Sequence, residues 1–393
     1  MRVGVNVART VDEVEALRPT WEELQGPHLG SDIDFFVTFL RHTPTVIRPH
    51  VVRVERVGAA PALVVARLED LPVEARLGYG IRYAPKVRTL VVVYGGFLGE
   101  IDDAGAGTVL AALADSLRGE RVDLVRLRML TVGSNLHAAA SSGAPALRRL
   151  RFAPRMRHWT ARIPESMDEF LGARSRERRK NVRRHARRLE EAYDGDVQVR
   201  LFRSPDQLGE LYADCEHIHR SSYQHALGVG FSTDERERAL TELGMEKGWF
   251  LGGLLYLEGE PVAYQLGNAY RGTYATSGTA FNPAHSELRP GTYVLTKVIE
   301  ELCRDPSVSR LDFGFGDADY KRAFADDSWE EQDVGVFAPR LRPLGVNLVQ
   351  TAMMGTSAAG RAALARTGRL SDVRRSWRSR LATRDRDGDE GGP

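Results

Sequence analysis

Four side chains that can move protons or hold negative charge lie close together in the last third of the chain. A short strand predicted over 309–313 carries Asp312 and leads into a glycine-containing loop with Asp317. Tyr320 and Lys321 follow directly. A carboxylate can remove a proton, a phenol can donate one, and an ammonium group can bind a phosphate or a developing negative charge. Residue types alone also allow plainer roles, with Asp317 as a helix cap, Tyr320 packed and Lys321 on the surface.

A second candidate site lies at the start of a helix predicted over 292–303. The residues before it are Arg289, a proline and Gly291. Proline in a first turn removes no helical hydrogen bond, and glycine lets a ligand approach the backbone. The amides of Gly291, Thr292 and Tyr293 would then point outward, which suits a phosphate or pyrophosphate. The alternative is a simple turn before a buried helix.

The order of these features resembles a known enzyme family. A Pro-Gly loop, a helix and a strand ending in Asp-Phe-Gly-x-Gly-Asp-x-x-Tyr-Lys (312–321) are similar to the CelD/BcsL-like (BioF-like) acetyltransferases of the GNAT superfamily. That family is related to the Fem aminoacyl-transferases of peptidoglycan bridge synthesis. The resemblance covers residues 155–340 well and the first half loosely. It implies catalytic roles for Asp312, Tyr320 and Lys321, with Asp317 as a further candidate.

The resemblance also implies a donor and its place. The donor would be acyl-CoA, most simply acetyl-CoA, with its pyrophosphate at residues 291–293 beside Arg289. In a GNAT fold the strand before this helix splays from its neighbour and leaves backbone groups for the pantetheine arm. Relatives often have a charged residue where this chain has Phe315 between two glycines, which leaves the identity of the substrate open.

A long basic helix is predicted from Ser166 to Tyr193. Charge runs of this kind are usually solvated helix faces, but they can also follow the phosphates of a cofactor or RNA. Members of the resembling family often carry Ser-x-x-x-Arg-Lys-Asn-x-Arg-Arg here, and residues 175–184 match it. Arg179, Lys180 and Asn181 are therefore candidate substrate contacts, with a charge network that stabilises the fold as the alternative.

Three further residues are candidate substrate contacts. Tyr223 follows a predicted helix in a segment that lines the acceptor side in related folds, and Tyr264 and Gln265 lie in a β-meander predicted over 249–279. The Cys-x-His-x-His run at 215–219 is a poor metal pattern, because residues two apart point to different faces of a helix. No metal site is expected.

The composition is that of a soluble globular chain. Its 393 residues are 42% hydrophobic and 27% charged, with a net charge of +2, so an anion site must come from local clustering of charge. Cys215 and Cys303 lie far apart in sequence, which fits a reducing compartment rather than a disulfide or zinc framework. We see neither a signal-peptide core nor an apolar run of transmembrane length, and expect a cytoplasmic protein.

We expect an α/β (α+β) fold of two tandem GNAT-like modules, each with a mixed, mostly antiparallel sheet flanked by helices. The boundary falls in the link at 138–155, which is rich in small residues. The first module, 1–154, would lack the donor site, because no matching motif follows its helix at 104–117. The second, 155–340, would be the acyltransferase module. A basic helical tail with a disordered end would form 341–393.

The function that the resemblance implies is N- or O-acyl transfer from acyl-CoA to an amine or hydroxyl. The acceptor would be a small molecule, a sugar or a cell-envelope precursor. One alternative keeps the fold and changes the donor to an aminoacyl-tRNA, as in Fem enzymes, with the basic helix following RNA. Another is a non-catalytic interaction protein. The tail would pack on the body or form a basic amphipathic helix in peripheral contact with a membrane.

Overall fold

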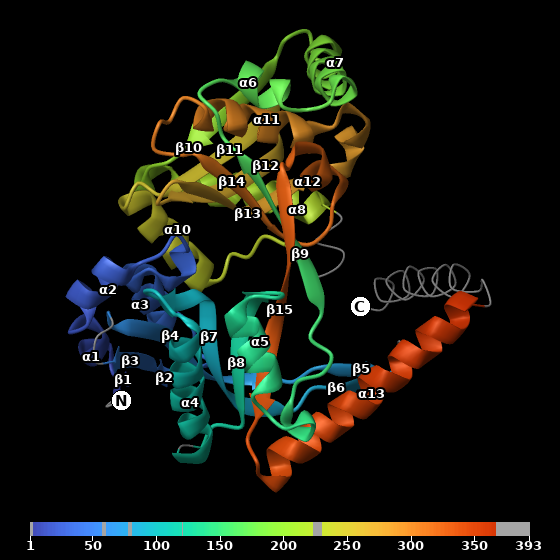
Figure 1. Ribbon diagram of the computed structural model, residues 1–393. Helices are drawn as coiled ribbons and strands as arrows, with labels where there is room; N and C mark the ends of the chain where they lie inside the picture. Colours follow the sequence, from blue (N-terminus) through green and yellow to red (C-terminus); the bar gives the residue numbers. More distant parts are fainter. Residues whose placement is uncertain (1–2, 57–59, 78–80, 120, 223–229, 367–393) are drawn as a thin grey trace, which may run out of the picture.

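The computed structural model describes residues 3–56, 60–77, 81–119, 121–222 and 230–366 (Figure 1). Its strands are β1 (Val3–Ala8), β2 (Val46–Pro49), β3 (Val51–Arg56), β4 (Ala62–Pro72), β5 (Ala75–Leu77), β6 (Ile81–Tyr83), β7 (Lys86–Leu98), β8 (Leu124–Thr131), β9 (Arg155–Arg162), β10 (Val197–Phe202), β11 (Phe250–Leu257), β12 (Glu260–Tyr270), β13 (Thr273–Phe281), β14 (Arg310–Phe315) and β15 (Asp327–Phe337).

The helices lie between these strands and around them (Figure 1). They are α1 (Val11–Glu15), α2 (Arg18–Leu24), α3 (Ile33–Arg41), α4 (Asp103–Gly119), α5 (Asn135–Ser142), α6 (Met167–Gly172), α7 (Arg176–Ala192), α8 (Leu208–Ser221), α10 (Glu235–Glu246), α11 (Pro290–Leu302), α12 (Asp319–Phe324) and α13 (Leu341–Arg366). Short 3-10 helices are η1 (Leu29–Ser31), η2 (Ala146–Arg148), η3 (Pro205–Gln207) and η4 (Pro283–Leu288). In the described part of the chain, no helix is both long and apolar enough to cross a lipid bilayer.

One large sheet runs through the molecule. Within the described residues it has thirteen strands, in the order β1-β3-β4-β7-β8-β15-β9-β14-β13-β12-β11-β10, with β2 beside β4. The pairs β7–β8 and β13–β14 are parallel, and the other neighbours are antiparallel. The prediction of a mixed, mostly antiparallel sheet flanked by helices is confirmed.

The chain builds the same series of elements twice. The first series is β1, β3, β4, β7, α4, β8, α5 and β9, and the second is β10, β11, β12, β13, α11, β14, α12 and β15. In each series the fourth and fifth strands are parallel and are connected by a crossover helix, α4 or α11. Such a connection is required because parallel neighbours cannot be joined by a tight hairpin. The tandem architecture follows from this repeat.

The two halves exchange their last strands at the centre of the sheet. β9 ends the first series but pairs with β14 of the second, and β15 ends the second series but pairs with β8 of the first. β9 and β15 also pair with each other, from Asp327↔Thr160 to Gln332↔Arg155. The predicted boundary after residue 154 coincides with the start of β9, yet the first series extends through this strand. The division into separate domains therefore stays a prediction.

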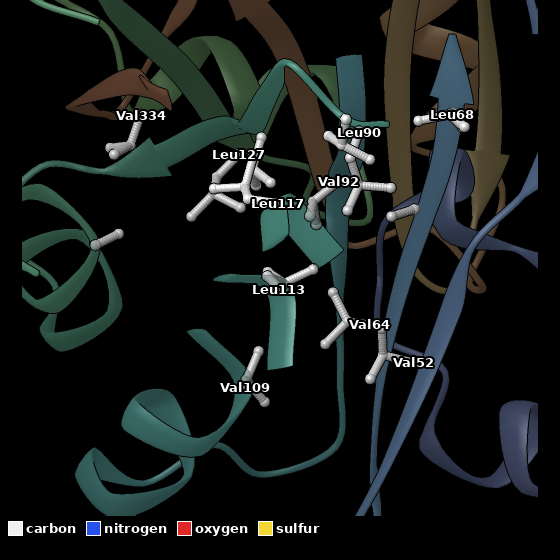
Figure 2. Packing of buried hydrophobic residues seen from close by; sticks show 14 of the residues in the cluster. Val52, Val64, Leu68, Leu90, Val92, Val109, Leu113, Leu117, Leu127 and Val334 are labelled. Atoms are coloured by element: carbon white, nitrogen blue, oxygen red, sulfur yellow. The ribbon is translucent and has the colours of Figure 1, made fainter. Parts of the chain in front are cut away.

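Apolar side chains alternate between the two faces of the N-terminal strands. Val64 and Val92 pack with residues of α4 (Figure 2). Val65 and Val93, the next residues along the same strands, belong to a cluster with Trp21 of α2. Because successive strand residues point to opposite faces, helices cover the sheet on both sides here.

One predicted element boundary in this half is wrong. The apolar run at 90–94, followed by Gly95 and Gly96, predicts from sequence alone a strand that ends in a loop. The strand β7 instead continues to Leu98. Gly95 has a φ of 67°, and the register of β7 against β4 shifts between Val64 and Ala66. The glycines therefore form a bulge within the strand, because glycine adopts positive φ without steric cost.

We expect Gly253→Ala to destabilise the protein by about 1–3 kcal/mol, because α11 packs directly on this position of β11. A Cβ atom at Gly253 would lie 2.6 Å from Cγ2 of Val298. Urea unfolding measures the effect. Gly209→Ala is the control, since a Cβ at Gly209 of α8 would meet no atom within 4 Å. Equal stability of the Gly253 variant and the wild type would contradict this close packing.

Candidate active site

The strands β13 and β14 separate soon after they begin to pair. Three residue pairs join them, ending at Ala275↔Asp312, while β13 continues to Phe281 beside β12. Beyond Ala275 the described residues provide no strand partner on this side of β13. The opening is a cavity of about 710 Å³, here called the C-terminal cleft, which residues 275–279 and 312–315 line from opposite sides. This is the splayed arrangement that the resemblance implied.

A second cavity continues from this opening towards the start of α11. This helix cavity has a volume of about 570 Å³ and shares Thr279 and Tyr320 with the C-terminal cleft. Its lining includes four residues predicted to contact donor or substrate, namely Gln265, Arg289, Gly291 and Thr292. The structure therefore brings both predicted sites, the motif at 312–321 and the start of α11, to one continuous groove.

The prediction that the amides of residues 291–293 are unpaired at the start of α11 is wrong for two of the three. The Thr292 and Tyr293 amides donate to the carbonyl oxygen of Arg289 at 3.0 and 3.2 Å. This is because the residue before a helix supplies the first acceptor of the helical hydrogen bonds. The Tyr293 side chain is buried away from the cavity, and its hydroxyl donates to Glu190 Oε1 at 2.9 Å. Gly291 remains at the cavity wall.

Asp312 occupies the junction between the C-terminal cleft and a larger cavity. It lines both spaces. Its Oδ1 atom accepts hydrogen bonds from Nε2 of His158 at 2.6 Å and from the amide of Gly314 at 2.7 Å. Among the described residues, Oδ2 has no hydrogen-bond partner. The carboxylate is thus held in place through one oxygen and can contact a ligand through the other.

Tyr320 and Lys321 lie beside this carboxylate on α12. Tyr320 lines both the C-terminal cleft and the helix cavity, and burial raises the pKa of its phenol, so the group stays protonated. The described residues offer its hydroxyl no hydrogen-bond partner. Lys321 is buried, and its Nζ atom donates to the carbonyl oxygen of Phe315 at 2.6 Å. Burial lowers the pKa of Lys321, and the charge of Asp312 opposes this shift.

His158 on β9 is a central residue that sequence reasoning missed. Its ring is almost fully buried and stacks on Trp329, with ring centroids 4.6 Å apart and an interplanar angle of 8°. Its Nδ1 atom faces Glu331 Oε2 at 3.4 Å. Burial disfavours the charged imidazole, but the hydrogen bonds and charges of Asp312 and Glu331 outweigh it and raise the pKa of His158 to about 9. The imidazolium therefore lies between two carboxylates at neutral pH.

The larger cavity lies between the two halves of the molecule. This central cavity has a volume of about 950 Å³, and β7 residues from Tyr94 onward and residues 128–131 of β8 line one side. Like β13 and β14, these two parallel strands pair over a few residues, from Thr89↔Leu124 to Val92↔Leu127, and then diverge. The N-terminal half thus has the same opening between its fourth and fifth strands, which its sequence did not indicate.

Residues from both halves line the central cavity. Tyr94 and His28 come from the first half, and Tyr270, Asp312 and Trp329 come from the second. The hydroxyl of Tyr94 donates to Glu331 Oε1 at 3.4 Å, and the Trp329 indole donates to the same oxygen at 2.7 Å. Burial is the main cause that lowers the pKa of His28. The cavity therefore has aromatic walls, with carboxylates where it meets the C-terminal cleft.

Some predicted residues lie outside this groove. Asp317 is exposed and forms an ion pair with Arg322, and it lines neither the C-terminal cleft nor the helix cavity nor the central cavity. Tyr264, by contrast, is buried in β12 and lies within the groove, where it contributes to the wall of the C-terminal cleft. Tyr223 lies outside the residues that the structure describes.

The basic segment forms two helices rather than the single predicted one. α6 ends at Gly172, and Ser175 caps α7 by accepting a hydrogen bond from the Arg178 amide. Arg179 donates hydrogen bonds to the carbonyl oxygens of Gly172 and Arg174 at 3.0 and 2.8 Å, and these bonds stabilise the C-terminal end of α6. Lys180 is exposed on α7.

Asn181 lies close to the groove. It lines a small pocket of about 200 Å³ that shares Arg289, Thr292 and Tyr320 with the helix cavity. Of the three candidates on the basic segment, Asn181 is therefore the one that the structure brings to the predicted donor site, while Arg179 supports the fold and Lys180 faces solvent.

Neither cysteine belongs to the site. Cys215 and Cys303 are buried and form no disulfide. Burial is the main cause that raises the pKa of both thiols, so neither is a ready nucleophile. The described residues contain no group of three or more His, Cys, Asp or Glu side chains that could hold a metal ion.

Comparison with known proteins finds a family similarity in the C-terminal half. Residues 176–322 match the family model of the acetyltransferase (GNAT) domain. The matched segment contains α7, the splayed strands and most of α12. None of the curated proteins compared with the chain matches it significantly.

Two solved structures have a similar fold over most of the chain. The crystal structure of FemX superimposes with a TM-score of 0.59 and 12% identity, covering 89% of this chain and 100% of that one. A conserved protein of unknown function from Bacteroides thetaiotaomicron VPI-5482 gives a TM-score of 0.53 and 13% identity, covering 85% of this chain and 100% of that one. The shared architecture therefore includes both halves.

We expect the contribution of His158 to stability to depend on pH. The pKa of His158 is raised from 6.5 to about 9, so its stabilising charge is fully present below pH 6.5 and is lost as the pH rises through about 9. Urea unfolding of the wild type and His158→Gln across this range should show the stability difference shrinking with rising pH. His217→Gln, on the exposed side of α8, is the control. A difference independent of pH would contradict a charged His158.

Proposed function

We propose that the protein is an N- or O-acyltransferase that moves an acyl group, most simply acetyl, from acyl-CoA to an amine or hydroxyl. The acceptor would be a small molecule, a sugar or a cell-envelope precursor. This proposal includes the closer likeness to the CelD/BcsL-like family and a cytoplasmic reaction. The observation that carries it is the position of Asp312, whose carboxylate faces a donor-type groove on one side and a separate large cavity on the other.

The residues of the groove suit acyl-CoA. The edge of β13 beyond Ala275 offers backbone groups to an extended pantetheine arm, because no described strand pairs with it there. At Gly291 an added Cβ would contact Phe281 at 3.4 Å, so the missing side chain leaves room at the cavity wall. Arg289 is exposed beside it and can bind a phosphate. When bound, acyl-CoA would supply the activated carbonyl group.

The acceptor would enter through the central cavity. This space reaches Asp312, which also lines the C-terminal cleft, and it has room for a group larger than a simple amine. Tyr94, Tyr270 and Trp329 provide flat apolar surfaces, while Asn268 and Thr160 provide polar groups. A ligand that combines apolar faces with hydroxyl or amine groups fits such walls.

The side chains at the junction support a simple division of roles. Oδ2 of Asp312 would take the proton from the attacking amine or hydroxyl. His158 is buried and would act as a positioning residue, because its Nε2 atom donates to Oδ1 and holds the carboxylate in place. The Tyr320 hydroxyl would return a proton to the departing sulfur, since its raised pKa keeps it protonated. The acceptor forms a bond to the acyl carbon and the carbon–sulfur bond breaks. Proton exchange with solvent then returns Asp312 to the carboxylate and Tyr320 to the phenol, so that in net one proton moves from the acceptor to the CoA thiol.

One observation favours a second candidate, transfer from an aminoacyl-tRNA. α7 presents exposed cationic side chains next to the pocket that adjoins the helix cavity. These residues are Arg176, Arg178, Lys180, Arg183, Arg184, Arg187 and Arg188. Two of them form exposed ion pairs, Arg183 with Asp168 and Arg188 with Glu287, which contribute little to stability. Such a face could follow an RNA backbone, and binding would then weaken steeply with salt.

We expect Asp312→Asn to lower kcat by roughly 10²- to 10⁴-fold while donor affinity changes little, because an amide cannot accept the proton. Release of CoA thiol from acetyl-CoA in the presence of a panel of amine and hydroxyl acceptors measures the rate. Asp115→Asn, an exposed position of α4, is the matched control. Unchanged turnover in the Asp312 variant would rule out this carboxylate as the base.

We expect Gly291→Glu to weaken binding of CoA by roughly tenfold or more, because it puts bulk and negative charge at the phosphate position. Calorimetry with CoA and acetyl-CoA measures this. Gly107→Glu is the control, since it makes the same change near the start of the equivalent helix α4. Absence of CoA binding by the wild type would overturn the acyl-CoA proposal, and salt-sensitive binding of aminoacyl-tRNA would then favour the second candidate.

A further inference from the structure

A small pocket lies between α7, α11 and α12, next to the helix cavity. It has a volume of about 200 Å³, and Arg289, Thr292 and Tyr320 line both spaces. Because much of its wall comes from α7, it is here called the α7 pocket. The helix cavity and the α7 pocket therefore adjoin at the start of α11, where the pyrophosphate of the proposed donor would bind.

The face of α7 that meets this pocket is polar where a packed helix face is normally apolar. Arg178, Asn181 and His185 recur at helical spacing and line the pocket, beside Val182, which packs on the core. Among the described residues, neither the Asn181 amide group nor the His185 ring has a hydrogen-bond partner, although both side chains are half-buried. Polar groups that are withdrawn from water normally have partners, so this face is suited to a polar ligand.

The charge of the α7 pocket is mainly positive. Arg174, Arg178 and Arg289 line it, and within the described residues the last two have no ion-pair partner. Asp319 also lines the pocket, but its carboxylate is exposed and pairs with Arg322. Uncompensated cations around a concave surface attract an anion.

The imidazole of His185 is affected by the same positive charge. Burial is the main cause that lowers the pKa of His185. The charges of Arg184, Arg289 and Arg188 lower this pKa further. The ring is therefore neutral at neutral pH and can donate a hydrogen bond from one of its nitrogens, in a place where bound negative charge is favoured.

Coenzyme A carries a suitable anion close to its pyrophosphate. The pyrophosphate is attached to a ribose that also carries a 3′-phosphate, which is a phosphate monoester. Only this ribose separates the two groups, so a site for the 3′-phosphate must adjoin the site for the pyrophosphate. The α7 pocket adjoins the helix cavity through Arg289 and Thr292, and guanidinium groups bind phosphates through paired hydrogen bonds.

We propose that the α7 pocket binds the 3′-phosphate of the donor, so that the protein distinguishes CoA from dephospho-CoA. Arg178 neutralises the phosphate together with Arg289, which lines both spaces. The Asn181 amide and the His185 ring donate hydrogen bonds to it. The inference rests on the proposed acyl-CoA donor and names the part of that donor which α7 recognises.

Calorimetry of the full chain with CoA and with dephospho-CoA, which lacks only this phosphate, tests the proposal. We expect the wild type to bind CoA roughly tenfold or more tightly, because charge-assisted hydrogen bonds to the phosphate are absent in dephospho-CoA. In Arg178→Gln most of this preference should disappear, whereas Arg178→Lys should keep part of it because the charge is retained. The control is Arg183→Gln, the same change at an exposed position of α7 that does not line the pocket.

Other outcomes would overturn the proposal. If the wild type binds CoA and dephospho-CoA equally, the α7 pocket does not bind the 3′-phosphate, while the binding of CoA itself still supports the acyl-CoA proposal. If Arg178→Gln keeps the full preference while circular dichroism shows it folded, the phosphate binds elsewhere. If the wild type binds neither ligand, the acyl-CoA proposal fails and this inference fails with it.

Discussion

The buried contact of His158 with Asp312 and Glu331 holds the centre of this protein together. Its three residues come from β9, β14 and β15, which are adjacent where the two halves exchange strands. Removing one member of such a buried charged group leaves the others uncompensated, which costs several kcal/mol. The strand order and the ionic contact therefore depend on each other. The pairing of β9 with β14 and β15 brings the charges together, and the charges make that pairing specific.

The exchange also explains why two openings meet at one carboxylate. Each half has a pair of parallel strands that diverge after a few residues, and each divergence leaves a cavity. Because β9 and β15 cross between the halves, the two openings approach each other at Tyr94 and Asp312, which line both. A tandem repeat with this exchange thus provides two spaces that share one carboxylate, that of Asp312, and the proposed transfer between two bound molecules rests on this arrangement.

The helices α7 and α13 both lie outside this centre, and only α7 lies beside the groove. α7 lies next to the groove, and Tyr293 of α11 donates a hydrogen bond to its Glu190. α13 instead packs against β5 and η2, on the N-terminal half. Val346 of α13 is buried in a cluster with Phe337 of β15, so this helix also contributes apolar packing. Of these two helices, only α7 is therefore placed to contact a ligand in the groove.

The sequence by itself determined what is local. The motif from Asp312 to Lys321 and the Pro-Gly start of α11 could be recognised because their residues lie within one or two turns or a single loop. Capping, glycine conformation and apolar periodicity act over that range. The same short range explains the errors. Nothing near Tyr94 shows that β7 continues through a bulge. The error at Thr292 and Tyr293 has a different cause, because their amides bond to Arg289, which is a local contact within the first turn of the helix.

Only the tertiary structure decided the rest of the site. His158 and Asp312 are 154 residues apart in sequence, and Tyr94 and Glu331 are 237 apart. Their proximity depends on the order of strands in the sheet, in which β15 leaves its own half to pair with β8. Any of these strands has the alternation needed to pair with several others, so local pattern cannot choose the neighbour. Burial of both faces of the sheet and the pairing of buried charges select which strand is the neighbour.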